Sequence, residues 1–252
     1  MTVSLTDAQL DRYARQIILK EIGGQGQRRL LGAEVVVIGA GGIGSPAIQY
    51  LAAAGVGLLT IIDDDRVELS NLQRQTLYGT ADIGLPKARR AKRGVEALNP
   101  DVAVDFSARR IDAANAERYL EGASVVLDGS DTFETRLAVA DAALRLRVPL
   151  VSAAVSEFEG QIGVYRGWEP DKPCYRCLVG SDPARPGRSC ADLGVLGAVA
   201  GVIGSLAAAE AIRLITGFGE DSAGKLMLID ALALRFRTVR LPKDPGCPAC
   251  AA

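Results

Sequence analysis

The chain has 252 residues, of which 48% are hydrophobic and 23% charged, and its formal net charge is −1. This composition is typical of a globular protein with one large domain, and the near-zero charge gives no support for a nucleic-acid or membrane-surface partner. The chain contains no histidine, which excludes a Ser–His–Asp triad, a Cys–His dyad and any histidine metal site.

The first predicted element is a helical arm in residues 1–30, with Asp7 as its cap. The N-terminus has no basic region followed by an apolar run, so we expect no signal peptide and a cytoplasmic protein. Hydrophobic strands and helices then alternate. Strands are expected at 34–40, 58–63, 102–107, 124–130 and 149–155, and helices at 43–54, 85–100, 112–121 and 133–146. This order predicts an α/β fold, a Rossmann-like doubly wound and mostly parallel sheet with helices on both faces.

The pattern changes after about residue 155. A strand or hairpin at 159–167, a loop at 171–190 and two strand-like runs at 225–231 and 232–241 predict a smaller part with antiparallel strands. Between them lies an uncharged run, 193–209, that is shorter than the roughly 18–20 apolar residues of a membrane span. We interpret it as a helix buried in the core or at a subunit interface. No linker is evident, so residues 1–252 are expected to form a single domain, with an arm (1–30), a core of alternating strands and helices (31–155) and a C-terminal part (156–252).

A glycine-rich turn, Gly39-x-Gly41-Gly42-x-Gly44, joins the first predicted strand to the first core helix. Glycines let the backbone approach a phosphate closely, and a helix N-terminus offers free N–H donors and partial positive charge. Asp63 ends the next strand, where a carboxylate can accept hydrogen bonds from ribose hydroxyls. The pattern predicts a nucleotide site; the alternative is a purely structural turn.

The stretch that follows Asp63 favours ATP over NAD. Asp65 or Asp131 could hold Mg²⁺, and Asp131 follows a strand whose carboxyl end lies at the same edge of the sheet. Taken singly, each polar residue here would usually be a solvated surface group. Arg74 and Lys87 could hold the β- and γ-phosphates of a triphosphate, and Asn71 and Gln73 add hydrogen-bonding capacity. An NAD-dependent oxidoreductase would have no obvious use for them.

Four of the five cysteines form two CxxC pairs, Cys174/Cys177 and Cys247/Cys250. Two such turns can complete a tetrahedral Cys₄ zinc site, which is coordinatively closed and therefore structural. The alternative is two redox-active or free pairs. The fifth, Cys190, precedes the small-residue helix, and nearby arginines could lower the pKa of its thiol.

Several stretches resemble one family closely. They are "RYARQ" (12–16), "VIGAGGIGSP" (37–46), "DDDRVELSNLQRQ" (63–75), "GLPKA" (84–88), "DGSD" (128–131), "EGQIGVY" (159–165), "PCYRC" (173–177) and "DPGCPAC" (244–250). On these motifs the chain resembles the ThiF/MoeB/HesA family of ubiquitin-activating-enzyme-like adenylyltransferases, across nearly its whole length.

The resemblance implies ATP-dependent adenylation of the C-terminal Gly-Gly carboxylate of a ubiquitin-like sulfur-carrier protein, with release of pyrophosphate. The expected pathway is molybdopterin or thiamine biosynthesis, with a separate sulfurtransferase as sulfur donor. A carboxylate is already an ionised nucleophile at pH 7, so the lack of histidine fits a reaction that needs positioning and charge neutralisation. The alternatives are the oxidoreductase and a non-catalytic scaffold of the same fold that only binds the carrier.

The resemblance also assigns roles to residues. Asp63 would bind the ribose and Asp131 would hold Mg²⁺. Arg15 would reach the nucleotide of a partner subunit, which implies a homodimer. Catalytic roles would fall to Arg15, Arg74, Lys87, Asp131 and, through a covalent link to the carrier in some members, Cys190. The ATP-binding set would be Gly39, Gly41, Gly42, Gly44, Asp63, Asp65, Ser70, Asn71, Arg74, Lys87, Asp131 and Thr132.

Two positions depart from the family pattern. Thr132 stands where the family often has asparagine, so a hydroxyl replaces an amide. Asp64 adds an acid between two positions that the family usually keeps acidic, and strand alternation predicts that it points to the opposite face.

Overall fold

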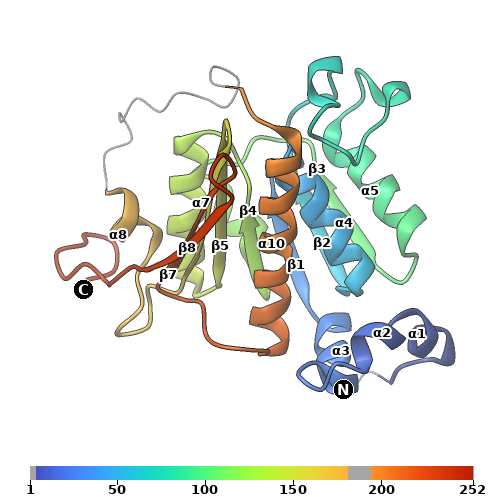
Figure 1. Cartoon of the computed structure of the whole chain (residues 1–252), viewed down its shortest axis with the longest axis horizontal. Helices are drawn as coiled ribbons and strands as arrows, with labels where there is room; N and C mark the ends of the chain where they lie inside the picture. Colours follow the sequence, from blue (N-terminus) through green and yellow to red (C-terminus); the bar gives the residue numbers. More distant parts are fainter. Residues whose placement is uncertain (1–3, 181–193, 252) are drawn as a thin grey trace.

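The computed structural model describes residues 4–180 and 194–251. Its centre is an eight-stranded sheet with the order β3-β2-β1-β4-β5-β6-β7-β8 (Figure 1). The strands are β1 (Glu34–Ile38), β2 (Leu58–Ile62), β3 (Ala103–Ser107), β4 (Val125–Asp128), β5 (Leu150–Ser156), β6 (Glu159–Tyr165), β7 (Lys225–Asp230) and β8 (Arg235–Arg240). The pairs among β1 to β5 are parallel, and those from β5 to β8 are antiparallel. The predicted fold class is confirmed.

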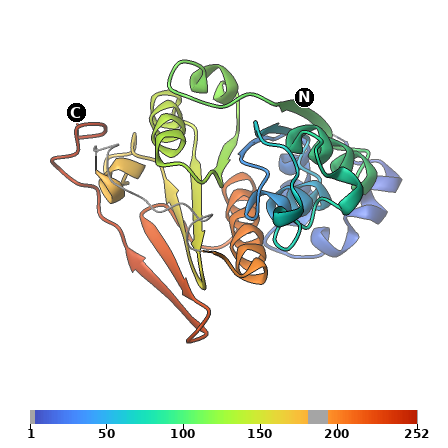
Figure 2. The same cartoon turned by 90° about the horizontal axis from the view of Figure 1, so that it is seen from above.

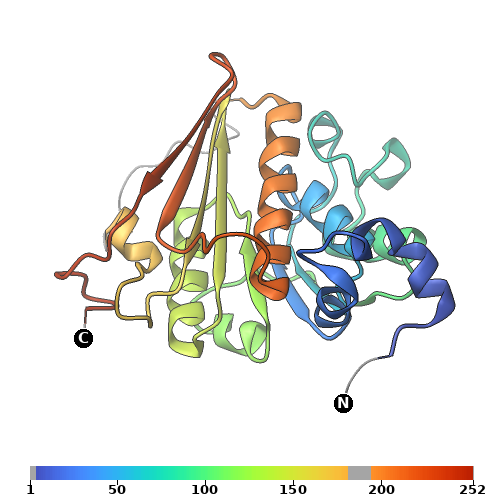
Figure 3. The same cartoon turned by 60° about the horizontal axis from the view of Figure 1, so that its bottom comes forward.

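Helices cover both faces of the sheet, and each face has its own hydrophobic core. Along β1, Val35 and Val37 belong to one core and Val36 and Ile38 to the other, as strand alternation requires. The first core includes residues of α4 (Gly44–Ala54), α5 (Lys87–Leu98) and α10 (Gly197–Thr216). The second includes residues of α6 (Ala116–Leu120) and α7 (Phe133–Leu146). Figure 3 shows α7 and α10 on opposite sides of β5 and β6.

The N-terminal arm consists of α1 (Asp7–Arg12), α2 (Ala14–Ile17) and α3 (Gly23–Leu31). The cap of α1 is Thr6 and not Asp7, because the Thr6 hydroxyl accepts the Gln9 N–H at 3.2 Å while the Gln9 side chain accepts the Thr6 N–H at 3.1 Å. Glutamine three residues after the threonine completes a capping box, which Asp7 cannot form. Tyr13 packs against the C-cap of α4, Gly55, and accepts a 2.9 Å hydrogen bond from Asn99 at the C-cap of α5. The arm therefore lies at the amino edge of the parallel strands.

Helix α10 carries the uncharged run noted in the sequence. It has 20 residues, and its apolar window has a mean hydropathy of 1.7, so by length and composition alone it could cross a membrane. Here α3, α4 and the strands β4, β5 and β6 contact it, and Ile203, Ala207 and Ala211 are fully buried. At Gly204 a Cβ atom would lie 2.2 Å from the Ile43 carbonyl oxygen, so the small residues permit close packing on the α4 region. One side of the helix packs into the core, as one of the two interpretations expected, and its place at a subunit interface stays a prediction.

Three short elements were not predicted: η1 (Leu69–Asn71), η2 (Thr80–Asp82) and α8 (Tyr175–Val179), the last inside the stretch expected to be loop. The β7–β8 hairpin extends away from the helical body (Figure 2).

Candidate functional site

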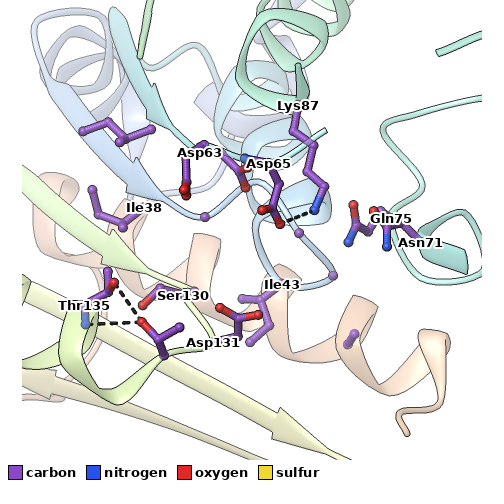
Figure 4. A pocket seen from close by; sticks show the side chains of 18 of the residues that line it. Ile38, Ile43, Asp63, Asp65, Asn71, Gln75, Lys87, Ser130, Asp131 and Thr135 are labelled. Atoms are coloured by element: carbon purple, nitrogen blue, oxygen red, sulfur yellow. Dashed lines mark hydrogen bonds and ion pairs between the residues drawn. The ribbon is translucent and has the colours of Figure 1, made fainter. Parts of the chain in front are cut away.

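A cavity of about 400 Å³ opens at the carboxyl ends of β1, β2 and β4 (Figure 4). The strand order changes direction between β1 and β4. In α/β proteins, such a change leaves a crevice at the carboxyl ends of the strands, where ligands bind. Among the residues named from the sequence, those that line it are Gly39, Gly41, Gly42, Asp63, Asp64, Asp65, Ser70, Asn71, Arg74, Lys87, Asp131 and Thr132. Gly44 and Arg15 do not line it, and Cys190 lies outside the described residues.

The glycine turn brings the backbone to the cavity wall. Gly39 has a φ of 84°, a left-handed conformation that other residues rarely adopt. At Gly44 a Cβ atom would lie 1.9 Å from the Gly39 carbonyl oxygen, so this glycine allows α4 to start directly against β1. No side chain caps the N-terminus of α4, which leaves its partial positive charge available to a phosphate at Gly42.

Asp63 is fixed by the backbone on both of its carboxylate oxygens. Oδ2 accepts the Ala40 N–H at 2.7 Å, and Oδ1 accepts the Asp65 N–H at 2.8 Å. Burial raises the pKa of the Asp63 carboxyl above its usual value, and the Lys87 ammonium opposes that rise. Each oxygen keeps a further lone pair, so the carboxylate can still accept hydrogen bonds from a ribose diol.

Lys87 and Asp65 form an ion pair in the cavity, with 2.9 Å between Nζ and Oδ2 (Figure 4). The lysine side chain is 6% exposed, whereas that of Asp65 is 61% exposed. Lys87 is the first residue of α5, and its backbone N–H is bonded to the Asp65 carbonyl. The buried ammonium is therefore held beside the cavity with a partner that a phosphate could replace.

The segment after β2 supplies further phosphate-type contacts. Asn71 is buried and its side-chain oxygen accepts the Glu68 N–H at 3.2 Å, while Arg74 donates to the Ser70 carbonyl at 2.9 Å. Gln73, expected to contribute here, is exposed and is not among the lining residues, but Gln75 is. The side-chain oxygen of Gln75 is buried and has no hydrogen-bond partner among the described residues. Both glutamines belong to the "SNLQRQ" stretch, and the sequence pattern does not distinguish the one that lines the cavity.

The loop after β4 carries Asp131 at the opposite wall. Asp131 is exposed and forms no ion pair with another described residue, so its carboxylate is available to a cation. Below it, Arg136 of α7 donates to the carbonyl oxygens of Ser130 and Ala153, the latter at 2.8 Å, and to the Ser152 hydroxyl at 3.2 Å. Arg136 thus connects the Asp131 loop to β5. The local sequence gave no indication of this role.

Thr132 acts as the N-cap of α7. Its hydroxyl oxygen accepts the Thr135 N–H at 3.3 Å, and its hydroxyl group is also 2.8 Å from that of Thr135. Thr132 therefore caps the N-terminus of α7 and also lines the cavity.

The expected orientation of Asp64 is wrong. Strand β2 ends at Ile62, so the strand alternation on which that prediction rested does not extend to residue 64. Asp64 lines the same cavity as Asp63, and its Oδ2 lies 3.0 Å from Nε of Arg110 in an ion pair. Arg110, which also lines the cavity, was not anticipated from the sequence.

A second cavity, of about 510 Å³, lies against the antiparallel half of the sheet. Its lining includes Arg235 and Arg237 of β8, and it shares Asp131, Arg136 and Val155 with the first cavity. Beside it, the two neighbouring hairpin turns expose large apolar side chains: Leu232 is 75% exposed, Leu234 85% and Phe158 41%. An extended chain lying in this cavity would reach the Asp131 end of the first one.

The four CxxC cysteines come together at the end of the C-terminal part. Their sulfur atoms all lie within 4.8 Å of one another. Three of the separations are 3.9 Å for Cys174–Cys177, 3.6 Å for Cys174–Cys247 and 3.5 Å for Cys177–Cys250. Tetrahedral zinc with Zn–S bonds of about 2.3 Å requires sulfur separations of about 3.8 Å. The four thiols are free of disulfides, and their spacing fits one such ion.

Comparison with known proteins gives a consistent set of relatives. The model of the ThiF family matches residues 13–249. The chain is 48% identical to the SAMP-activating enzyme E1 of Haloferax volcanii, over 99% of this chain and 92% of that protein. It is 47% identical to the sulfur carrier protein adenylyltransferase of Thermus thermophilus, over 97% and 92%. It is 40% identical to the molybdopterin-synthase adenylyltransferase of Salmonella typhimurium, over 98% of each.

Among solved structures, the fold is similar to that of E. coli MccB crystallised with ATP. The TM-score is 0.79 and the sequence identity 26%, over 89% of this chain and 68% of that one.

Proposed function

The chain belongs to the ThiF family, and on that basis we propose that it uses ATP to adenylate the C-terminal carboxylate of a ubiquitin-like sulfur-carrier protein. Relatives aligned over nearly their whole length are adenylyltransferases by name, so the chain is an adenylyltransferase and the oxidoreductase alternative is set aside. The observation that supports ATP as substrate is the first cavity, where the glycine turn, Asp63 and the cations Arg74 and Lys87 meet. The name of the Salmonella relative favours molybdopterin synthesis over thiamine synthesis.

The reaction follows from the positions of these groups. A carrier carboxylate oxygen attacks the α-phosphorus, the bond from that phosphorus to the pyrophosphate oxygen breaks, and pyrophosphate leaves with the electron pair. Asp63 orients the nucleotide through the ribose. Arg74 and Lys87 neutralise the phosphates and the charge that grows on the leaving group, which is the usual source of rate enhancement in phosphoryl chemistry.

A magnesium ion fits the donor set at the Asp131 end of the cavity. Mg²⁺ prefers one or two carboxylates together with substrate phosphates, and Asp131 offers an exposed carboxylate without an ion pair among the described residues. Bound there, the ion would supply charge neutralisation on the triphosphate. Asp65 would become available as a second ligand once a phosphate replaces it beside Lys87.

The carrier would bind to the C-terminal part, residues 156–252, while residues 31–155 bind the nucleotide. Support comes from the second cavity, which joins the first at Asp131, Arg136 and Val155. The exposed apolar tip made of Phe158, Leu232 and Leu234 lies beside it and offers a surface for the body of a folded carrier. The cavity would then receive the carrier's extended C-terminal tail.

Radiolabelled ATP–pyrophosphate exchange tests the proposed function directly. Wild-type protein with Mg²⁺ and a carrier ending in Gly-Gly should catalyse exchange, and Arg74→Ala and Asp131→Ala should each reduce the rate by about 100-fold or more. Arg145→Ala, which breaks an exposed ion pair with Glu117 at the far end of α7, is the matched control and should leave exchange unchanged. ATP binding without exchange, whichever carrier is supplied, would leave only the non-catalytic scaffold.

A homodimer with shared sites would explain the position of Arg15. Arg15 is exposed on α2, at the amino edge of the strands, whereas the cavity is at the carboxyl edge. It therefore cannot serve the cavity of its own chain. Mixing inactive Arg15→Ala with inactive Arg74→Ala protein should restore exchange, because a mixed dimer holds one site with both arginines. No recovery on mixing, with mixed dimers present, would contradict the shared site.

We also propose that the cysteine cluster binds structural zinc, that a separate sulfurtransferase supplies sulfur, and that the protein acts in the cytoplasm. The cluster's closed Cys₄ geometry gives the metal no open coordination position for substrate. Its role would be to fasten the C-terminal tail to α8.

A further inference from the structure

The first cavity has a charged end and an apolar end. Lys87 and Asn71 lie at the charged end, and Ile38 at the other, with Asp63 between them (Figure 4). Ile62 is paired with Ile38 across β1 and β2, Ile111 belongs to the same hydrophobic core, and both also line the cavity. All three isoleucines are buried, with exposures of 2%, 2% and 4%. If Asp63 holds the ribose and Lys87 the phosphates, the base of the nucleotide must lie toward the isoleucines.

Arg110 lines the same cavity. It follows β3 by three positions and directly precedes Ile111, whose buried side chain anchors the loop in the core. Its guanidinium is held by Asp64, with Nε and Oδ2 3.0 Å apart. The arginine side chain is 67% exposed, so its outer surface is in water while its position at the cavity is fixed by the ion pair.

We propose that Arg110 stacks on the outer face of the nucleotide base, which the isoleucines contact on the inner face, and that Asp64 positions it for this contact. A guanidinium is planar and weakly hydrated, and it stacks readily on aromatic faces. The inference rests on the proposed function, since it requires a nucleotide in this cavity. It adds a binding residue and a positioning residue to the set that surrounds the phosphates.

The alternative is an exposed surface ion pair with no ligand contact. Such pairs contribute little to stability, so a stability measurement would not separate the two. The two interpretations are distinguished by comparing the binding of ligands that contain the base with the binding of ligands that lack it. AMP carries the base and ribose, whereas tripolyphosphate carries only the phosphate chain.

Calorimetric binding of ATP, AMP and tripolyphosphate to the full-length protein provides this test. Arg110→Ala should weaken ATP and AMP by the same factor, roughly threefold to thirtyfold, the range of a cation–π contact, and leave tripolyphosphate unchanged. Arg110→Lys should recover only part of the loss, because lysine keeps the charge but loses the planar group that stacks on the base. Asp64→Asn should raise KM for ATP in pyrophosphate exchange with little change in kcat. Arg145→Ala again serves as the matched control.

The outcomes distinguish this inference from the proposed function. Unchanged AMP affinity in Arg110→Ala, with wild-type protein binding ATP normally, would overturn the stacking role alone. Full recovery by Arg110→Lys would replace stacking with a simple charge effect and also overturn it. Failure of wild-type protein to bind ATP at all would overturn the proposed function, and the inference with it.

Discussion

The parallel and antiparallel halves of the sheet hold their polar side chains in different ways. In the parallel half, the cavity residues follow the ends of β1, β2 and β4, and backbone N–H groups fix the central carboxylate, Asp63, on both oxygens. In the antiparallel half, the cysteine cluster joins Cys174 and Cys247, 73 positions apart, and the four thiols contact one another.

The two sites differ in whether the fold alone can hold their residues in place. The first cavity is a consequence of the fold, because strand ends and helix starts place the groups that line it. The cysteine cluster brings together two segments that no strand pairing joins, so an ion that binds all four thiolates would itself hold the tail in place. Removing a ligand should therefore be harmless to one half and damaging to the other.

The largest effect is expected from breaking the cysteine cluster. If the cluster binds zinc as proposed, Cys177→Ser or treatment with a chelator should lower the thermal midpoint by about 10 °C or more, because the binding energy of that ion would be part of the folding energy. Differential scanning calorimetry measures the shift, and elemental analysis should find one zinc per wild-type chain. Below the transition, calorimetric ATP affinity should be retained, since no cysteine of the cluster lines the nucleotide cavity.

The fifth cysteine provides the control for that experiment. Cys190→Ser removes a thiol that is not part of the CxxC pairs, and it should keep the full metal content and the wild-type midpoint. A Cys177→Ser protein that melts at the wild-type temperature would show that the tail needs no ion. If Cys177→Ser protein lost both the metal and ATP binding below its unfolding transition, the nucleotide affinity of one half would depend on the metal site of the other.

The second prediction concerns the glycine turn in the parallel half of the sheet. Gly44→Ala places a Cβ atom 1.9 Å from the Gly39 carbonyl oxygen, a backbone atom that cannot move without shifting the turn. We expect the free energy of unfolding to fall by about 3 kcal/mol, or roughly 8 °C in the midpoint. Gly24→Ala is the matched control: a Cβ atom there meets nothing within 4 Å, and alanine favours the helix. Equal stability of the two variants would mean that the turn can relax and is less fixed by the fold than its contacts indicate.

How much the sequence could predict follows the same division. Local patterns placed the strands of the parallel half, the glycine turn and Asp63, because strand ends at one edge of a doubly wound sheet meet by topology. The cysteine pairs were also predictable, because their spacing is a signal in itself. Arg136 and Arg110 were not, since each acts through tertiary neighbours: one joins the Asp131 loop to β5, and the other depends on where β2 stops. Gln75 differed from Gln73 only in burial, which the sequence does not reveal.

The smallest effect is expected from the Lys87–Asp65 ion pair, and it tests whether Asp65 stabilises the buried ammonium. Asp65→Asn leaves the Lys87 ammonium, 6% exposed, without its carboxylate partner. Because Asp65 itself is 61% exposed and solvent screens the pair, the expected loss is only about 1 kcal/mol in the free energy of unfolding. In a Lys87→Met background the same substitution should cost almost nothing, because the ammonium that Asp65 pairs with is no longer present. Urea denaturation of the two single variants and the double variant measures this coupling. Additive losses would mean that Asp65 does not stabilise the Lys87 ammonium. A phosphate would then not have to displace Asp65 in order to bind Lys87.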